Sequence, residues 1–495
     1  MTAKSLSPAA ALWSELVDTA MLGTDRRPLP APPAGPFGRF GLGSDAVALL
    51  HRAAAVLAAR RAGAVPEPAG LPLTPCLPDD RVQCPGPAAA RLGAMLAGRH
   101  ADLLGEWLAA LRAADLALPP EHLAVLVERT RDDHERFRMV SAAAGSLLSW
   151  LSALLPSLGW PTTSGEPPEE AWERGTAAER VAALRAMRAA DPASVKSRLS
   201  GGLPGERVDV RAACYATLAV GLSPADEGLL ERALDDRGSA VREVAAGLLA
   251  TLPTSAWAGR MAQRARRMVR TVGPAGQDQF EIALVAPLPP TWERDGINAS
   301  APPGTSLGVH LLRQVVAGTP LAVWEDMSDV AHLLVLASEH ELGPVLIAGW
   351  TEAAARQRDG RWGRLLAEET ADPVLVPVLA ADDVRRLALR SAVAGEVLAP
   401  MALAAFEAMP APWSPELRSK VGEAVATLFL ERRVGRHRVP SLRRLARALD
   451  PAMLVAVSDT LTPIGLPAPV DGLRDELVDL LRFRGAMLEE LVPWP

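Results

Sequence analysis

The feature that most constrains this sequence is a helical pattern that returns after 31 residues. The stretch ERVDVRAACYATLAVGL is followed by DDRGSAVREVAAGLLATLP, and in both a Val-Arg pair opens an alanine-rich apolar run. A shorter stretch before each of them, ASVKSRLSGGL or ADEGLLERALDD, corresponds at the same spacing. The corresponding positions are Val210 and Val241, Arg211 and Arg242, Leu218 and Leu249, Leu199 and Leu230, and Leu203 and Leu234.

A repeat of this kind predicts two helices joined by a tight turn. One such pair cannot bury its apolar face alone, whereas stacked copies form a continuous core. Alanine and leucine favour helix, and the residues that favour strands are scarce, with seven Phe and one Tyr in 495 residues. The sequence therefore predicts an all-α chain, a HEAT-like α-solenoid of helix-pair repeats with Pro/Gly-rich loops. One short extended segment is expected near 280–286.

Loops rich in proline and glycine divide the predicted helices into four regions. The strongest internal boundary is TVGPAGQDQFEIALVAPLPPTWERDGINASAPPGTS, where helical periodicity fails. The expected regions are an N-terminal helical region (1–165), the HEAT-like repeats (166–270), an irregular linker or loop (271–306) and a C-terminal helical region (307–495).

Charge and cysteine content limit the partners and the compartment. The formal net charge of −6 argues against a nucleic-acid-binding protein, since such proteins usually carry an excess of basic residues that neutralise phosphates. Cys76, Cys84 and Cys214 form no CxxC pair, which suits a reducing compartment. Glu15 and Asp18 interrupt the apolar N-terminal run, unlike a signal peptide, and the run GSLLSWLSALLPSLGW is too short to cross a bilayer. We expect a soluble cytoplasmic protein.

No sequence motif indicates a catalytic, cofactor-binding or metal-binding site. HELGP begins like a zinc-protease helix but has Pro344 where the second histidine would stand. GRFGLGSD is glycine-rich, yet no strand precedes it and no GK[ST] follows. We therefore predict no catalytic residue, no cofactor and no metal ligand. The sequence favours a non-enzymatic protein while leaving enzymatic activity open.

Two loops stand out as candidate interaction loops. LGTDRRPLP reads as a specified turn, and PPTWERDGIN holds the turn pair Asp-Gly beside a tryptophan and an arginine. The candidate residues are Gly23, Thr24, Asp25 and Arg26 in the first loop, and Trp292, Arg294, Asp295 and Gly296 in the second. The alternative is that the second loop only packs against its own chain, with Trp292 as an anchor.

The Val-Arg pairs of the repeat are expected to be structural. Val241 should face the core between helices. An arginine at the start of the second helix of a pair commonly binds an aspartate near the turn, here Asp209 or Asp236. Cys214 stands where the next copy has alanine, so it is interpreted as a small core residue.

Three stretches in order, WSELVDTAMLGTDRRPLP, LERALDDRGSAVREVAAGLLATLPTSAWAGRM and PPTWERDGI, resemble an uncharacterised bacterial family classed only as a domain of unknown function. The resemblance is strong from residue 13 to about 300 and loose beyond. It implies a chromosomal neighbourhood with a SWIM zinc-finger protein, a MoxR-type AAA+ ATPase and a von Willebrand factor A-domain protein. The family has no established catalytic residues, so the resemblance implies none here.

The leading hypothesis is a scaffold or adaptor that binds other proteins, including the AAA+ ATPase and the von Willebrand factor A-domain protein. One alternative is an enzyme or enzyme subunit with a site near 271–306. The other is a HEAT-like nucleic-acid-binding protein with an arginine-lined concave face, which the net charge argues against. No membrane partner is expected.

Overall fold

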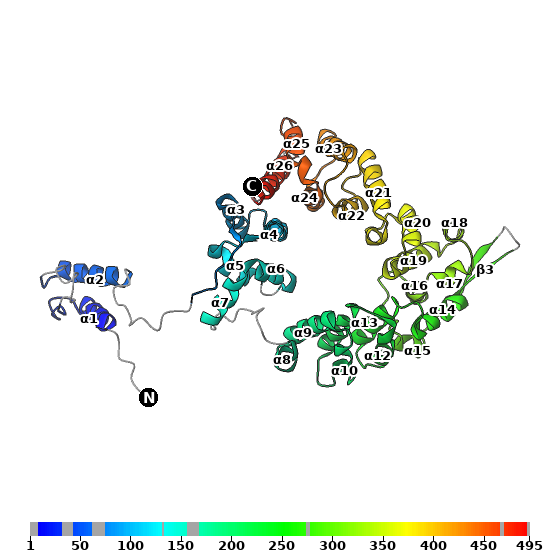
Figure 1. Ribbon diagram of the computed structural model, residues 1–495, viewed down its shortest axis with the longest axis horizontal. Helices are drawn as coiled ribbons and strands as arrows, with labels where there is room; N and C mark the ends of the chain where they lie inside the picture. Colours follow the sequence, from blue (N-terminus) through cyan, green and yellow to red (C-terminus); the bar gives the residue numbers. More distant parts are fainter. Residues whose placement is uncertain are drawn as a thin grey trace. The chain divides into compact units, whose positions relative to one another are not determined.

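The computed structural model shows a predominantly helical chain, 69% helix and 3% strand, which confirms the all-α class (Figure 1). It divides into two compact units, residues 1–77 (unit 1) and 78–495 (unit 2). The structure describes residues 8–31, 43–61, 75–130, 133–155, 168–273, 278–465 and 470–492.

Unit 1 is a pair of helices. They are α1 (Pro8–Leu22) and α2 (Ala46–Arg61). The side chain of Asp45 accepts a hydrogen bond from the Ala48 amide at 2.9 Å, which caps the start of α2. Leu16 of α1 and Val56 of α2 are buried between the helices. Arg52 points into the unit and donates to the Gly43 carbonyl at 2.8 Å.

The first part of unit 2, up to residue 155, is a compact group of helices. Its elements are β1 (Val82–Gln83), α3 (Gly86–Leu96), η1 (Ala101–Leu103), α4 (Leu104–Ala113), β2 (Leu116–Ala117), α5 (Pro120–Thr130), α6 (His134–Ala144) and α7 (Ser146–Leu154). The two short strands pair in parallel, Val82 with Leu116 and Gln83 with Ala117. Trp107 is buried at the centre of this group.

The repeat region follows as alternating helices. Its elements are α8 (Pro168–Arg174), α9 (Ala177–Ala190), α10 (Ser194–Leu199), α11 (Val208–Ala216), η3 (Thr217–Ala219), η4 (Pro224–Asp226), α12 (Glu227–Ala233), α13 (Ser239–Leu249) and α14 (Ala256–Met268). The helices α9, α11 and α13 begin at positions 177, 208 and 239, so the spacing of 31 residues holds for three helices in succession.

The same positions are buried in each copy. Ala183, Cys214 and Ala245 correspond, and all three are buried in one core, which agrees with the interpretation of Cys214 as a small core residue. The Val-Arg signature marks only two copies, because α9 has a Glu before Arg180 at the corresponding place. The structural repeat therefore begins with α9, one copy before the first Val-Arg pair.

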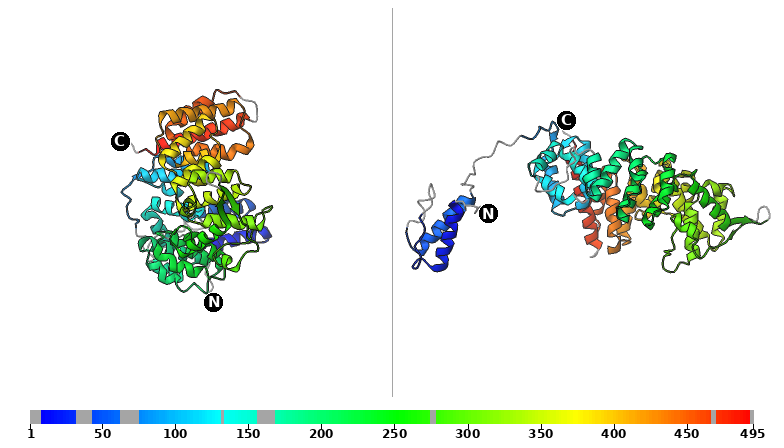
Figure 2. Two further views of the ribbon diagram at one scale, coloured as in Figure 1. Left: turned by 90° about the vertical axis from the view of Figure 1, so that its right-hand side faces the viewer. Right: turned by 90° about the horizontal axis from the view of Figure 1, so that it is seen from below.

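A short β-hairpin follows the repeats and projects beyond the helices (Figures 1 and 2). Its strands are β3 (Val269–Val272) and β4 (Gln279–Ile282), paired antiparallel with Val269 opposite Ile282. One extended segment was expected here, and the described residues hold this hairpin as well as the β1–β2 pair. The expectation missed β3 because its residues continue an arginine-rich helical pattern.

The remaining helices complete unit 2. They are α15 (Pro290–Arg294), α16 (Leu307–Gly318), α17 (Ala322–Glu325), α18 (Val330–Ser338), α19 (Gly343–Gln357), α20 (Gly360–Thr370), η5 (Pro373–Val378), α21 (Ala381–Val393), α22 (Pro400–Ala408), α23 (Pro415–Leu430), η6 (Arg436–Arg438), α24 (Val439–Ala448), η7 (Pro451–Met453), α25 (Leu454–Leu461) and α26 (Val470–Glu490). Trp324, Trp350 and Trp362 form a buried aromatic cluster, with Trp350 5.6 Å and 5.5 Å from the other two ring centroids. Phe280 of β4 lies 6.2 Å from Trp350 and anchors the hairpin.

The last helix of unit 2 packs on the first ones, as Figure 1 shows for α26 beside α3 and α4. Arg91 of α3 binds Glu490 at 2.6 Å, and Arg484 of α26 binds Glu106 of α4 at 2.8 Å. One core accordingly combines residues 88–148 with 376–491, while a second core spans 183–375. This grouping differs from the four expected regions, since the residues of 1–165 belong partly to unit 1 and partly to a core shared with the C-terminal helices.

Candidate functional site

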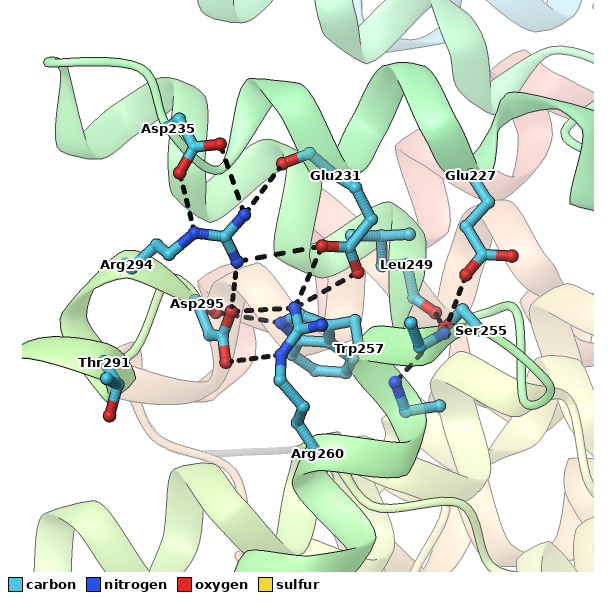
Figure 3. A network of polar contacts seen from close by, with 12 residues as sticks. Glu227, Glu231, Asp235, Leu249, Ser255, Trp257, Arg260, Thr291, Arg294 and Asp295 are labelled. Carbon is cyan, nitrogen blue, oxygen red and sulfur yellow. Dashed lines mark hydrogen bonds and ion pairs between the residues drawn. The ribbon is translucent and has the colours of Figure 1, made fainter.

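The second candidate loop surrounds a buried carboxylate, that of Asp295, of which only 1% is exposed. It follows the one-and-a-half turns of α15, and two arginines of α14 reach it. Arg260 donates to both carboxylate oxygens at 3.0 and 2.8 Å, and Arg264 donates to one of them. Arg294 adds a third contact at 3.1 Å. Figure 3 shows Arg260 and Arg294 converging on Asp295 from two elements.

The same arginines extend the network to α12. Arg294 binds Asp235 at 2.7 Å, and Arg260 binds Glu231 at 3.1 Å (Figure 3). Three arginines thus meet three carboxylates, so the charges balance within the network. It fixes α15 and its turn onto α12 and α14.

The environment keeps Asp295 ionised. Burial raises the pKa of its carboxyl, but the hydrogen bond from Arg260 and the charge of Arg264 outweigh burial and leave the pKa below its ordinary value. Burial lowers the pKa of the Arg264 guanidinium, which the nearby Asp295 charge only partly opposes. A paired, satisfied carboxylate of this kind holds structure together and has no free oxygen poised for proton transfer.

Gly296 is required by the geometry of the turn. Its φ is +82°, and a Cβ there would lie 2.6 Å from the Ala246 Cβ and 3.0 Å from the Arg242 carbonyl oxygen. The Trp257 indole donates to the Asp295 carbonyl at 3.0 Å. The Asp-Gly pair therefore packs against α13 and α14, as the packing alternative for this loop anticipates.

The other two candidates in this loop are more accessible. The Trp292 ring is half-buried and lies 5.2 Å from the guanidinium carbon of Arg264. Arg294 is half-buried, with its guanidinium turned toward the network. A role of this loop in binding a partner stays a prediction, and it would rest on the outer edges of these two side chains.

The first candidate loop lies in unit 1, directly after α1. Gly23 has a φ of +87°, and its carbonyl accepts hydrogen bonds from the amides of Arg26 and Arg27 at 3.1 Å. Asp25 and Arg26 are exposed, and Thr24 is half-buried. The loop is a specified turn, as predicted, and its binding role stays a prediction.

The Val-Arg pairs have the expected structural surroundings. Val241 is fully buried, and Arg211 of α11 binds Asp236, in the turn between α12 and α13 of the next repeat, at 2.6 Å. Arg242 donates to the Asp236 carbonyl at 3.0 Å and reaches Glu293 at 3.3 Å. The second arginine thus connects α13 to α15 through Glu293, a contact that the sequence did not suggest.

A polar groove lies beside the second candidate loop. It has a volume of about 310 Å³ and lies between α13 and the chain after α15. Its lining includes Ser239, Arg242, Glu243, Asn298 and Ser300. One side of it, from Leu288 to Ser300, belongs to the 271–306 region near which the enzyme alternative placed its site, and the other side is α13.

A second groove on unit 2 is apolar and has a volume of about 650 Å³. It is formed by η5, α21, the segment 408–414 and the start of α23. Its apolar lining includes Leu379, Val384, Leu389, Met409, Trp413 and Leu417. The groove cannot be predicted from any single stretch of sequence, because its residues come from four separate elements.

Arginines surround the apolar groove. Arg385 and Arg386 line it, and a neighbouring hollow of about 360 Å³ that shares Arg386 adds Arg364 and Arg390. The carboxylates among these lining residues are Glu368 and Asp383. Arg385 and Arg386 are each paired with an aspartate three residues earlier on α21, Asp382 and Asp383. The remaining positive charge at the rim comes from Arg364 and Arg390, opposed by Glu368.

Other chemistry is sparse in the part of the chain that the structure describes. It contains no group of three or more His, Cys, Asp or Glu side chains that could hold a metal ion. Burial raises the pKa of the Cys84 and Cys214 thiols to about 11, so both stay protonated near neutral pH.

Among the described helices, none alone has the length and apolar character that crossing a membrane requires. The pair 136–144 and 146–154, bent by 95°, meets that requirement only when its two members are taken together.

Comparison with known proteins places the chain in a family without assigning it an activity. No curated protein and no solved structure matches it. A family model matches residues 15–491, which extends the likeness well beyond the first three fifths that the sequence motifs cover. The chain belongs to a family of unknown function, DUF5691.

Proposed function

We propose that this chain is a non-enzymatic helical-repeat scaffold, a HEAT-like α-solenoid that binds other proteins. The observation that carries the proposal is the apolar groove. Apolar surface rimmed by polar residues is typical of places where proteins bind one another. The three helices that begin 31 residues apart support the repeat architecture, which suits extended binding surfaces.

The chemistry of the groove favours an acidic amphipathic helix as the bound element. Leu379, Leu389 and Met409, which are half-buried, would contact apolar side chains of that helix at helical spacing. Arg385 and Arg386 at the rim would attract carboxylates that flank those anchors. The MoxR-type AAA+ ATPase and the von Willebrand factor A-domain protein that the family resemblance implies are the first candidate partners.

Charge reversal at the rim tests the proposal. The tagged full chain is mixed with each purified candidate at about 0.15 M salt, where surface charges still act over roughly 8 Å. We expect recovery of at least one candidate, and loss of about tenfold in affinity for Arg385→Glu with Arg386→Glu. The matched control is Arg432→Glu with Arg433→Glu, an adjacent exposed pair outside the lining of the groove.

Two results would contradict the proposal. One is failure of the wild-type chain to retain either candidate, and the other is equal binding by the two double variants. Since the polar groove supports the enzyme alternative near 271–306, co-purified small molecules should be identified by mass spectrometry. Retained DNA or RNA would instead favour the nucleic-acid alternative.

A further inference from the structure

The outer face of α2 in unit 1 carries a second apolar stripe, opposite the face that packs on α1. Val47, Leu50 and Leu57 are 57%, 65% and 42% exposed, and Ala54 between them is exposed as well. Their spacing of three, four and three residues is that of the a and d positions of a heptad. Such a stripe is a seam for a further helix.

Apolar side chains lie on both faces of α2 in unit 1. Ala48 and Ala55 of α2 face α1, whereas Leu50 and Leu57 face outward. On α1, Met21 is the most exposed large apolar side chain, and Val17, one turn before it, is exposed too. A helix that is apolar on two faces is normally buried on both.

The stripe fits a second copy of itself. Between residues 46 and 58 the ionisable residues are His51 and Arg52, and Arg52 turns inward to the Gly43 carbonyl. Two copies can therefore approach without opposing like charges. An antiparallel pairing centred near residue 52 sets Leu50 opposite Ala54 of the second copy, large against small, as close packing requires.

We propose that unit 1 is a dimerisation module, in which α1 and α2 of two copies of this chain form a four-helix bundle. The interface is isologous, with the stripe of each copy contributing the same surface. The pairing would remove from solvent the apolar side chains that the packing of α1 on α2 leaves exposed. The proposal is independent of the apolar groove and of any partner protein.

The test measures the mass of the full chain in solution by light scattering over a concentration series, because dimers depend on protomer concentration. We expect wild type to have twice the chain mass of 52.2 kDa at roughly 50 µM protomer, where a dimer of micromolar affinity is formed. Leu50→Glu with Leu57→Glu should return it to the mass of one chain. Val393→Glu, an exposed valine of unit 2, is the control and should leave the dimer intact.

Circular dichroism keeps the comparison interpretable, since all three proteins should have the same helix content and melting temperature for unit 2. A wild-type chain that has the mass of one chain up to about 100 µM overturns the proposal, because a specific dimer of even modest affinity would form there. A double variant that keeps its fold and remains dimeric overturns it equally.

Discussion

At the scale of single residues, buried ion pairs join separate helices of unit 2. Arg188 and Asp226 are fully buried and 2.7 Å apart, and Asp295 is held by Arg260 and Arg264. For Asp226 and Asp295 burial raises the pKa, but the arginine contacts outweigh it and lower the pKa below its ordinary value. These carboxylates stabilise the folded chain only while they are ionised.

Asp295→Asn should lower the free energy of unfolding at pH 7 by about 3 kcal/mol, because it leaves Arg264 buried without its counter-charge. Since the folded pKa of Asp295 lies below the unfolded one, its stabilisation is present above the unfolded pKa and is lost as pH falls through the folded pKa. Melting temperatures between pH 7 and pH 3 should therefore fall less steeply for the variant than for wild type, below roughly pH 5.

Asp235→Asn is the control for this network. Its carboxylate binds Arg294 but is largely exposed, so its loss should cost less than about 1 kcal/mol. Equal destabilisation by the two substitutions would show that Asp295 is not the centre of the network.

Gly296 and Gly304 form a matched pair for testing why the Asp-Gly turn needs glycine. Their φ angles are +82° and +81°, but a Cβ at Gly304 would meet no atom within 4 Å. Gly304→Ala should cost about 1 kcal/mol from backbone strain alone. Gly296→Ala should cost about 1–3 kcal/mol more, because its Cβ overlaps Ala246. Chemical denaturation of both variants measures the difference, and equal costs would refute the overlap.

At the scale of elements, the spacing of apolar residues determines which face of each repeat helix is buried. The orientation of α13 can be tested by substitution. Val241 is fully buried and Arg242 keeps part of its side chain in solvent. Val241→Asp should cost several kcal/mol, since it buries an unpaired charge. Arg242→Ala should cost about 1–2 kcal/mol through lost hydrogen bonds and packing. Thermal melts that rank the two in reverse order would mean that α13 is rotated from its described orientation.

Sequence periodicity predicted most helices, because it depends on residues near one another in the chain. It left the partner of the repeat arginines open between Asp209 and Asp236, and Arg211 binds Asp236, which lies 25 residues further along the chain. Periodicity missed β3, since pairing with β4 overrides the arginine-rich helical pattern that precedes this strand. It also missed the apolar groove, whose lining from Leu379 to Leu417 meets only after four elements have packed. The sequence left open whether Asp295 packs inside the chain or faces a partner, because an Asp-Gly turn has the same sequence pattern whether it is buried or exposed.

At the scale of the whole molecule, the last helix of unit 2, α26, packs against the early helices α3 and α4. Arg484 of α26 is buried and donates to the carbonyls of Ala446 and Leu449 as well as to Glu106. One side chain thus links α24, α26 and α4. The shared core depends on this junction as much as on its apolar side chains.

Arg484→Ala should therefore loosen elements on both sides of the junction. We expect a loss of about 3 kcal/mol, since the substitution leaves Glu106 and two carbonyls without their donor. Hydrogen–deuterium exchange should rise in α4 and α24 together. Arg482→Ala, an exposed neighbour on α26, should leave both unchanged, and faster exchange in α26 alone would contradict the link.

The junction also sets the order in which the chain can fold during its synthesis. Glu490, the partner of Arg91, is translated 399 residues later, and Arg484 follows Glu106 by 378 residues. At about 5–20 residues per second, the helices α3 and α4 wait on the order of tens of seconds for the helix that covers them. The apolar surface that α26 covers in the folded chain stays open to solvent throughout that time, which exposes the nascent chain to non-native association.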